Sequence, residues 1–425
     1  MQISFKGNKS LLAIFCIVFF THFLSKVCYI TDSRWTLHTS WAMVHHRNMQ
    51  LDQFRETIEK NNFYAIDERD GHLYYSFPPG TSLLCAPLLA VMDKAAKRVY
   101  YLDVSNLLSG YAHQGMELFL AAFILALTAV LLFVVLKQFE IDTWLNWLLI
   151  IAFAYGTSAW SVASRGLFAH GPSMLFLTGT IWALNKSKQN ENWLWLAGFL
   201  LGFSYIIRPT NSVGILAFGL YILYTYRFEC WRAIVPGGLV LLLFVLRNYA
   251  VYGNILSPYY QPSHMGNDNH LLQGIAGNLF SPNRGLFIFS PFFLLLLPLL
   301  YTAFKQRALT PLLYTVIATV VLHTLLISYF NNWYAGWCFG PRYFADVLPL
   351  MMILMAVGLQ AVVRQSTGVY RATVLSAFSV LALISCGIHY KGANDIKTEQ
   401  WNYIPNNIDD NRGRVWDWND IQFLR

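Results

Sequence analysis

A lone carboxylate follows the first long apolar run of the chain. The stretch 29–52 (YITDSRWTLHTSWAMVHHRNMQLD) begins where that run ends, which places Asp32 and Arg34 at a membrane surface. Ionisable groups at membrane depth are costly to hold there and usually serve a function. We therefore interpret Asp32 as a carboxylate at the mouth of a membrane-embedded cavity. The alternative is an ordinary loop aspartate that caps the helix expected at 36–47.

Five arginines gather at the ends of the apolar runs on the side that carries Asp32. They are Arg165, Arg208, Arg247, Arg284 and Arg342. The positive-inside rule would favour the opposite ends, so these arginines need another explanation. An anionic ligand supplies one, because guanidinium forks match phosphate oxygens better than lysines do. The alternative is that each arginine snorkels to lipid headgroups or pairs with a carboxylate such as Asp32 or Asp346.

Two breaks between apolar runs contain proline beside an arginine, namely RPTN at 208–211 and FGPRY at 339–343. Proline and glycine at such breaks free backbone groups and let helix N-termini point at an anion. His170 lies at a comparable level and could donate to a phosphate or a sugar hydroxyl, unless it is a satisfied structural histidine. The residues expected to bind phosphate are Arg342, Arg208, Arg165, Arg284 and His170.

The composition is that of a polytopic membrane protein. Of the 425 residues, 56% are hydrophobic and 12% are charged, and the mean hydropathy is +0.42. Soluble proteins carry about 25% charged residues. The net charge of +8 does not indicate nucleic-acid binding, because most lysines and arginines fall in short loops between apolar runs.

Apolar stretches of about 20 residues cross a bilayer as helices, and the sequence contains about eleven of them. They are 11–30, 115–136, 144–162, 168–184, 193–207, 213–226, 233–246, 286–304, 309–328, 343–363 and 372–388. We therefore expect an all-α membrane domain over 1–390, with about eleven transmembrane helices.

The short loops between these stretches are basic. Their charges are Lys137, Lys186, Lys188, Arg227, Arg232, Lys305, Arg307, Arg364 and Arg371. The positive-inside rule places these loops and the N-terminus in the cytoplasm, and the long segments on the other side. The expected protein is integral and multi-pass in a bacterial inner membrane, with its active site on the extracytoplasmic face.

The first outer loop, 31–114, is expected to hold a small folded unit. It contains a helix at 36–47 and a hairpin formed by 63–66 and 72–77 around an Asp-Gly turn. The apolar stretch 81–92 is too short to cross and is expected to lie in the interface or to re-enter it. The extracytoplasmic tail 391–425 contains three tryptophans and is expected to form a folded cap.

The motifs of other common chemistries are missing from the sequence. It contains no GxGxxG, P-loop, HExxH or GxSxG pattern. His45 and His46 are adjacent rather than four apart, and the six cysteines show no paired spacing, so no metal site or disulfide framework is expected. The cytoplasmic loops are too short to form a nucleotide-binding domain. An enzyme with its site on the outer face would therefore lack cytosolic nucleotide-activated donors, and its donor would be lipid-linked and carry phosphate.

Three short motifs and their order resemble a known family. They are TDSR at 31–34, YYSFPPG at 74–80 and RPTN at 208–211. Over most of 11–388 the chain is similar to the GT-C superfamily of membrane glycosyltransferases, in the branch of protein O-mannosyltransferases, aminoarabinose transferases and lipopolysaccharide-core transferases. The resemblance implies a polyprenyl-phosphate sugar donor, a helical fold with a large first outer loop, inversion at the anomeric carbon, and Asp32 as the catalytic carboxylate.

The chain departs from that family at several places. Many members have an acidic pair where this chain has Asp32-Ser33, and some have Glu-Lys where Ser76-Phe77 stand. That glutamate helps to hold a divalent ion in some relatives, so the resemblance does not carry a divalent-cation site over to this chain. The large periplasmic C-terminal domain of some members has no counterpart here.

These patterns together predict glycosyl transfer at the outer face. Asp32 would accept the proton of an acceptor hydroxyl, and the arginines would stabilise the leaving polyprenyl phosphate. The acceptor is a lipid, a glycan or a protein. The side chains expected to contact the sugar, unless they belong to the interfacial aromatic belt, are Arg34, Tyr74, Tyr75, Trp337 and Tyr343.

Two other classes of protein remain open. A transporter or flippase for an anionic lipid or metabolite would also place arginines in a cavity, although such proteins usually show internal repeats that this sequence lacks. In a non-catalytic assembly subunit, Asp32 would only pair with an arginine.

Overall fold

Helices make up almost all of the regular structure of this chain. The structure is a computed structural model that describes residues 5–29, 31–100, 104–108, 113–260, 271–365 and 367–425. The sheet within these residues is a two-stranded hairpin. The helices of the main bundle are α1 (Phe5–Phe23), α6 (His113–Gln138), α7 (Thr143–Tyr155), α8 (His170–Ser187), α9 (Trp193–Ile207), α10 (Ser212–Tyr226), α11 (Trp231–Tyr252), α12 (Leu271–Phe280), α13 (Leu286–Phe289), α14 (Leu296–Lys305), α15 (Pro311–Tyr329), α16 (Leu348–Gln365) and α17 (Gly368–Asn394). The predicted all-α fold is confirmed.

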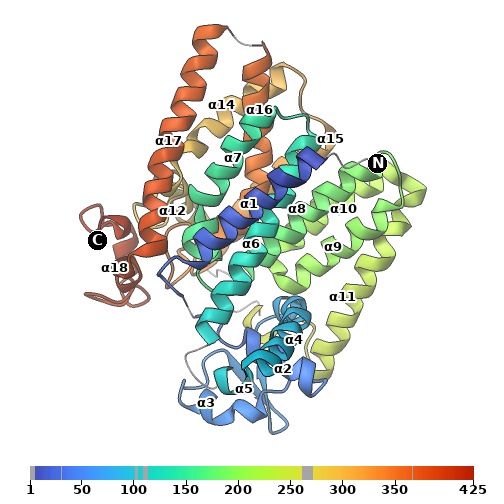
Figure 1. The fold of residues 1–425 in the computed structure, drawn as a ribbon, viewed down its shortest axis with the longest axis vertical. Helices are drawn as coiled ribbons and strands as arrows, with labels where there is room; N and C mark the ends of the chain where they lie inside the picture. The colour runs from blue at the N-terminus through green and yellow to red at the C-terminus, as the bar shows by residue number, and fades with distance from the viewer. Residues whose placement is uncertain (1–4, 30, 101–103, 109–112, 261–270, 366) are drawn as a thin grey trace.

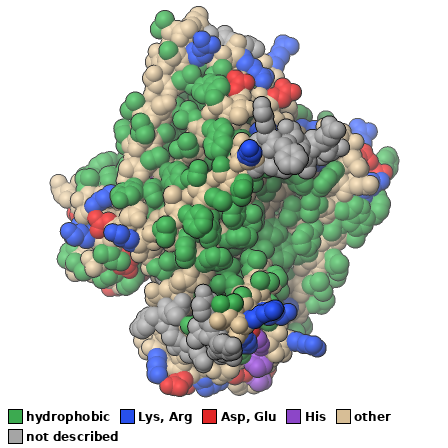
Figure 2. Space-filling model, in the orientation of Figure 1, with side chains coloured by type: hydrophobic (Ala, Val, Ile, Leu, Met, Phe, Trp, Pro, Cys, Tyr) green, Lys and Arg blue, Asp and Glu red, His purple; other side chains and the backbone are tan. Residues whose placement is uncertain are grey.

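The bundle has the proportions of a membrane protein. Each predicted apolar stretch is helical over most of its length. Five helical segments are long and apolar enough to cross a membrane: His113–Gln138, Pro209–Tyr252, Pro311–Tyr329, Arg342–Arg364 and Gly368–Asn394. Hydrophobic side chains cover the middle of the face shown in Figure 2, and charged side chains gather at its upper and lower ends and at its left and right edges. The chain is therefore an integral, multi-pass membrane protein.

The helix α16 forms the centre of the bundle. The segment Arg342–Arg364, which contains it, has 94% of its apolar window buried inside the protein. It packs against α6, α7, α8, α14, α15 and α17. A helix surrounded on all sides is hydrophobic all round. The 3-10 helix Arg342–Val347 leads directly into this one, so the middle of the bundle positions the side chain of Arg342.

The first helix ends earlier than the apolar pattern predicts. It stops at Phe23, and residues 24–29 continue in an extended path instead of the helix expected up to 30. The amide of Val27 donates to the carbonyl of Ala393 at 3.0 Å, and the amide of Tyr29 donates to Arg165 at 2.6 Å. Both side chains are buried, so protein rather than lipid surrounds Val27 and Tyr29, whereas Leu24 is exposed. Hydropathy alone does not separate these two environments.

A small lobe lies at one end of the bundle, below α6 and beside the end of α11 in Figure 1. Its elements are α2 (Thr36–His45), α3 (Arg55–Glu59), β1 (Ile66–Arg69), β2 (His72–Tyr75), α4 (Gly80–Tyr100) and α5 (Val104–Leu108). The turn at Asp70-Gly71 is confirmed. The first strand is Ile66–Arg69 rather than 63–66, because Phe63 and Ala65 have positive φ angles of 52° and 58° that cannot extend a strand.

The interfacial helix is also longer than predicted. The expected helix at 81–92 is α4, which runs on through Asp93 to Tyr100. Asp93 is buried and accepts a hydrogen bond of 3.0 Å from Lys97, one turn later. An acid and a lysine at this spacing stabilise a helix, so the charges that were expected to end it extend it instead.

The C-terminal residues fold against the loop that precedes α16. The helix α17 continues to Asn394, and the segment after it contains α18 (Ile396–Gln400) and a 3-10 turn at Arg412–Trp416. Buried side chains from both parts form one cluster: Trp333, Tyr334, Trp401, Ile408 and Val415. We call residues 395–425 the C-terminal tail.

Candidate active site

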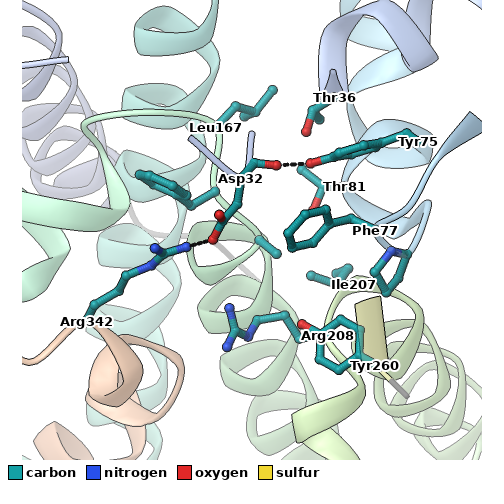
Figure 3. A pocket seen from close by; sticks show the side chains of 13 residues that line it. Asp32, Thr36, Tyr75, Phe77, Thr81, Leu167, Ile207, Arg208, Tyr260 and Arg342 are labelled. Carbon is teal, nitrogen blue, oxygen red and sulfur yellow. Dashed lines mark hydrogen bonds and ion pairs between the residues drawn. The ribbon is translucent and has the colours of Figure 1, made fainter. Parts of the chain in front are cut away.

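Asp32 and Arg342, which are 310 residues apart, form an ion pair between Oδ2 and Nη2. The hydroxyl of Tyr64 donates to Asp32 Oδ1 at 3.1 Å, and the hydroxyl of Tyr75 donates to the Asp32 carbonyl. Figure 3 shows the carboxylate pointing at the guanidinium, with Tyr75 behind it. Burial raises the pKa of both tyrosine hydroxyls above their usual value, so both remain donors at neutral pH.

The segment that carries Asp32 is fixed to the loop between α7 and α8. Gly166 lies against the backbone of Tyr29, where a Cβ would overlap the carbonyl oxygen. The carboxylate of Glu117, on α6, accepts from the hydroxyl of Ser33 at 2.6 Å and from the amide of Leu167 at 3.1 Å. Glu117 is fully buried. Its two hydrogen bonds join both sides of the site to one rigid helix.

His170 connects the two arginines of the site. Its Nδ1 lies 3.0 Å from Asp346 Oδ1, and its Nε2 lies 3.2 Å from Arg342 Nε and 3.2 Å from Arg208 Nη1. A guanidinium can only donate hydrogen bonds. Nε2 is therefore the acceptor, Nδ1 carries the proton that is donated to Asp346, and the imidazole is neutral.

The two arginines are compensated by two carboxylates. Arg208 Nε lies 2.9 Å from Asp346 Oδ2, and Arg342 pairs with Asp32. Asp346 is fully buried, and each arginine is 6% exposed. Arg342 also lies over the ring of Phe168, 4.6 Å from its centroid. Buried charges persist only when they are paired in this way, so the site is a neutral, fully connected network.

Local sequence brings Arg208 to this position. The helix α9 ends at Ile207 because Pro209 follows, and Arg208 has the extended conformation that residues before proline prefer, with φ −145° and ψ 114°. Gly80, at the start of α4, packs against the backbone of Ile206, where a Cβ would overlap it. The PPG motif therefore docks the lobe onto the bundle beside Arg208.

Two cavities open on this network, and a third adjoins one of them. The inner cavity, of about 30 Å³, contains Asp32, Arg208 and Arg342 in its wall, as Figure 3 shows. The polar cavity, of about 520 Å³, is lined by Asp32, Arg34, Tyr64, Trp337, Arg342, Tyr343, Asp409 and Arg412 among others. The lateral cavity, of about 400 Å³, is lined by Tyr205, Leu256, Tyr259, Leu326, Phe330, Tyr343 and Arg412 among others. Asp32 and Arg342 face two of the three.

The structure brings most of the predicted contact residues to these cavities. Arg34, Trp337 and Tyr343 line the polar cavity, and Tyr75 lines the inner one. Tyr74 does not line any of the three. It points to the other side of its strand, where its ring lies 6.3 Å from that of Tyr252.

Two predicted phosphate-binding arginines lie away from the cavities. Arg165 is fully buried and donates to the backbone carbonyls of Ser25, Val27 and His22. Arg284 is 1% exposed and donates to the carbonyls of Tyr334 and Gly336 and to two side chains of the tail. Both guanidinium groups are saturated by protein acceptors, and both fix loops that surround the site.

Several residues of the site carried no functional prediction. Tyr64 and Arg412 lie in stretches without a recognisable motif. Asp346 was considered only as a possible partner of the arginines. Glu117 has the same sequence signal as Asp32, a single carboxylate at the edge of an apolar run. Within the described residues, no three His, Cys, Asp or Glu side chains gather in a group that could hold a metal ion.

Comparisons with known proteins identify a similarity to solved structures. No family model matches the chain, and no curated protein matches it. Among solved structures, the chain is similar to ArnT from Cupriavidus metallidurans in the apo state. The match covers 91% of this chain and 75% of ArnT, at 12% sequence identity and a TM-score of 0.48. The roles of the residues of this chain rest on the site geometry described above.

Proposed function

We propose that this protein is a membrane glycosyltransferase that moves a sugar from a polyprenyl-phosphate donor to an acceptor hydroxyl, with inversion at the anomeric carbon. The observation that carries this proposal is the Asp32–Arg342 pair, which opens on the inner and polar cavities together. A carboxylate supplies the base for the acceptor, and a guanidinium beside it supplies the counter-charge for a leaving phosphate. The motifs of the GT-C superfamily support the same reaction.

In the proposed reaction, the acceptor oxygen attacks the anomeric carbon while the bond from that carbon to the phosphate oxygen breaks. The acceptor proton moves to the Asp32 carboxylate, and the bonding electron pair leaves with the polyprenyl phosphate. Attack opposite to the leaving group inverts the anomeric configuration. The leaving phosphate gains negative charge, and Arg342 and Arg208 lie where they can neutralise it.

The ion pair between Asp32 and Arg342 couples the departure of the phosphate to the deprotonation of the acceptor. While Arg342 holds the carboxylate, the negative charge of Asp32 is stabilised and its basicity is reduced. As charge develops on the leaving phosphate, the guanidinium turns towards the phosphate and releases the carboxylate. Asp32 thereby becomes a better base at the moment when the acceptor loses its proton.

His170 and Asp346 hold the guanidinium groups of Arg342 and Arg208 in fixed positions. The neutral Nε2 accepts from both guanidinium groups, so it fixes them without neutralising either one. Asp346 accepts a hydrogen bond from Nδ1 of His170 and so favours the tautomer in which Nε2 is free to accept. In the proposed reaction these two residues are positioning residues, and neither needs to gain or lose a proton.

The distribution of basic residues along the chain supports an extracytoplasmic location for this chemistry. The lobe and the tail belong to the long segments that follow apolar runs, whereas the short basic loops lie at the other end of the bundle. With the basic loops in the cytoplasm of a bacterial cell, the site opens on the side where envelope glycans are assembled. The acceptor is then a lipid, glycan or protein hydroxyl on that side.

The direct test of the proposed function is a product-release assay. Purified protein is incubated with a panel of polyprenyl-phosphate sugars and with candidate acceptors, and free polyprenyl phosphate is measured. We expect release from at least one donor, dependent on an acceptor and absent with boiled protein. Transport of the intact lipid across vesicles with no release from any donor would contradict the proposal and favour a flippase.

A further inference from the structure

The C-terminal tail is held in a fixed place against the site. Arg284 donates to the carbonyl of Tyr334 at 2.8 Å and to Asn402 Oδ1 at 3.1 Å, and so joins the cavity loop to the tail. Gln422 is fully buried, and its amide donates to the carbonyls of Cys338 at 2.8 Å and Thr398 at 2.9 Å. The tail is therefore a built part of the wall rather than a loose end.

Two residues of this tail line the larger cavities: Asp409, in the polar cavity, and Arg412. Arg412 lines both the lateral and the polar cavity, which share Tyr259, Asn332 and Tyr343 as well. Its guanidinium lies 5.6 Å from the centroid of the Tyr334 ring. The tail thus places a positive charge where the two larger cavities join.

Arg412 differs from Arg342 and Arg208 because it makes no ion pair within the described residues, although Asp409 of the same tail also lines the polar cavity and Arg34 there donates to a neutral amide. Arg342 pairs with Asp32, Arg208 pairs with Asp346, and the neighbouring Arg414 donates to Asp420 at 2.9 Å. Arg412 is exposed and makes no hydrogen bond or ion pair with any other described residue. It can bind an anion without giving up an existing partner.

The lateral cavity fits an apolar chain that ends at this arginine. Leu256, Leu326 and Phe330 lie in its wall, and Arg412 lies at its junction with the polar cavity. A long apolar chain gains free energy by leaving water for such a surface, and an anionic group at its end gains a guanidinium partner. The polar cavity beyond the junction contains Asp32 and would hold the group attached to that anion.

We propose that Arg412 binds the phosphate of a lipid-linked ligand at the junction of the lateral and polar cavities, with the lipid chain in the lateral cavity. This inference rests on the proposed function, since it names the place where the donor binds. A polyprenyl-phosphate sugar is a phosphodiester with one negative charge, and Arg412 neutralises that charge. A second negative charge develops on the phosphate when its bond to the sugar breaks, and Arg342 and Arg208 stabilise that charge.

The test uses two probes that share one lipid chain: farnesyl phosphate, which ends in an anionic phosphate group, and farnesol, which ends in a neutral hydroxyl. Binding of each to the full-length protein in phosphatidylcholine nanodiscs is measured by titration calorimetry. The variants are Arg412→Gln, Arg412→Lys and, as a control, Arg425→Gln, which removes an arginine of the same tail that pairs with Asp420 and does not line these cavities.

We expect Arg412→Gln to weaken farnesyl phosphate binding by about tenfold to a hundredfold, the range for a charge-assisted hydrogen bond. Farnesol binding should not change, Arg412→Lys should lose less, and Arg425→Gln should bind both probes as the wild type does. Undiminished binding of farnesyl phosphate by Arg412→Gln would exclude Arg412 as the phosphate-binding residue, without affecting the proposed function. If the wild-type protein does not prefer farnesyl phosphate over farnesol, the lipid-phosphate donor of the proposed function fails as well.

Discussion

Ser33, the residue after Asp32, donates a 2.6 Å hydrogen bond to the buried carboxylate of Glu117. Glu117 accepts a second hydrogen bond from the amide of Leu167, so one helix fixes both loops that form the floor of the site. Many members of the resembled family have a second acid at the position of Ser33. In this chain, the residue at that position binds a carboxylate instead of providing one.

Replacing Glu117 separates its role as an acceptor from its charge. Glu117→Leu leaves the Ser33 hydroxyl and the Leu167 amide buried without an acceptor, which costs about 1–3 kcal/mol for each such group. We expect a lower melting temperature and a large loss of turnover, whereas Glu117→Gln keeps an acceptor oxygen and should retain most of both. Thermal denaturation and product release measure the two effects. A leucine variant as stable and active as the wild type would show that this contact positions nothing.

Arg342 is expected to act on the leaving group more than on donor binding. Arg342→Gln should lower kcat by about a hundredfold to a thousandfold, the usual effect of removing one donor that stabilises developing charge. Arg371→Gln, at an exposed arginine in the first turn of α17, is the control and should leave kcat unchanged. Steady-state kinetics distinguish the outcomes, since a change confined to KM would assign Arg342 to ground-state binding.

His170 is expected to position the arginines without titrating in the reaction. His170→Ala leaves two buried guanidinium groups without their shared acceptor and should cost about 1–3 kcal/mol of stability together with most of kcat. His170→Asn keeps an acceptor and should recover part of the activity with the pH profile of the wild type. A pH profile that loses one ionisation in the asparagine variant would instead give His170 a role in proton transfer.

The contact between the tail and the cavity loop is expected to weaken at high pH. Burial raises the pKa of Tyr334 to about 12, with Asp409 acting in the same direction. Its stabilising contribution is therefore complete below about pH 10, the usual tyrosine pKa, and is lost as the pH rises through about 12. Limited proteolysis of the tail should increase across this interval in the wild type and stay flat in Tyr334→Phe. Equal pH dependence in both proteins would exclude Tyr334 as the titrating group.

The sequence predicted the helical stretches, the Asp-Gly hairpin turn and the meeting of Asp32 with Arg342 and Arg208. These features follow from hydropathy, turn chemistry and the cost of charges near a membrane, all of which are local properties. The early end of α1 at Phe23 was not predictable in this way. An apolar segment buried by α17 and an apolar segment in lipid have the same hydropathy.

The arginines show where sequence reasoning reaches its limit. Arg165 and Arg342 carry the same signal, a guanidinium beside an apolar run on the same side. In the structure, Arg165 is saturated by backbone carbonyls, whereas Arg342 faces two cavities. Carbonyl acceptors occur at every residue and leave no trace in the sequence. For the same reason Arg412 was overlooked, since its place at the cavity depends on how the tail folds back.

Asp32 is proposed to remove the proton of the acceptor, and the variant Asp32→Asn tests this role. Asparagine has almost the same shape but cannot accept that proton, and Asp70→Asn, at an exposed turn of the same lobe, is the matched control. Product release from a productive donor is measured beside donor binding. We expect Asp32→Asn to bind the donor and to release no polyprenyl phosphate, and we expect the control to release it at the wild-type rate. Release at the wild-type rate by Asp32→Asn would exclude Asp32 as the residue that removes the acceptor proton.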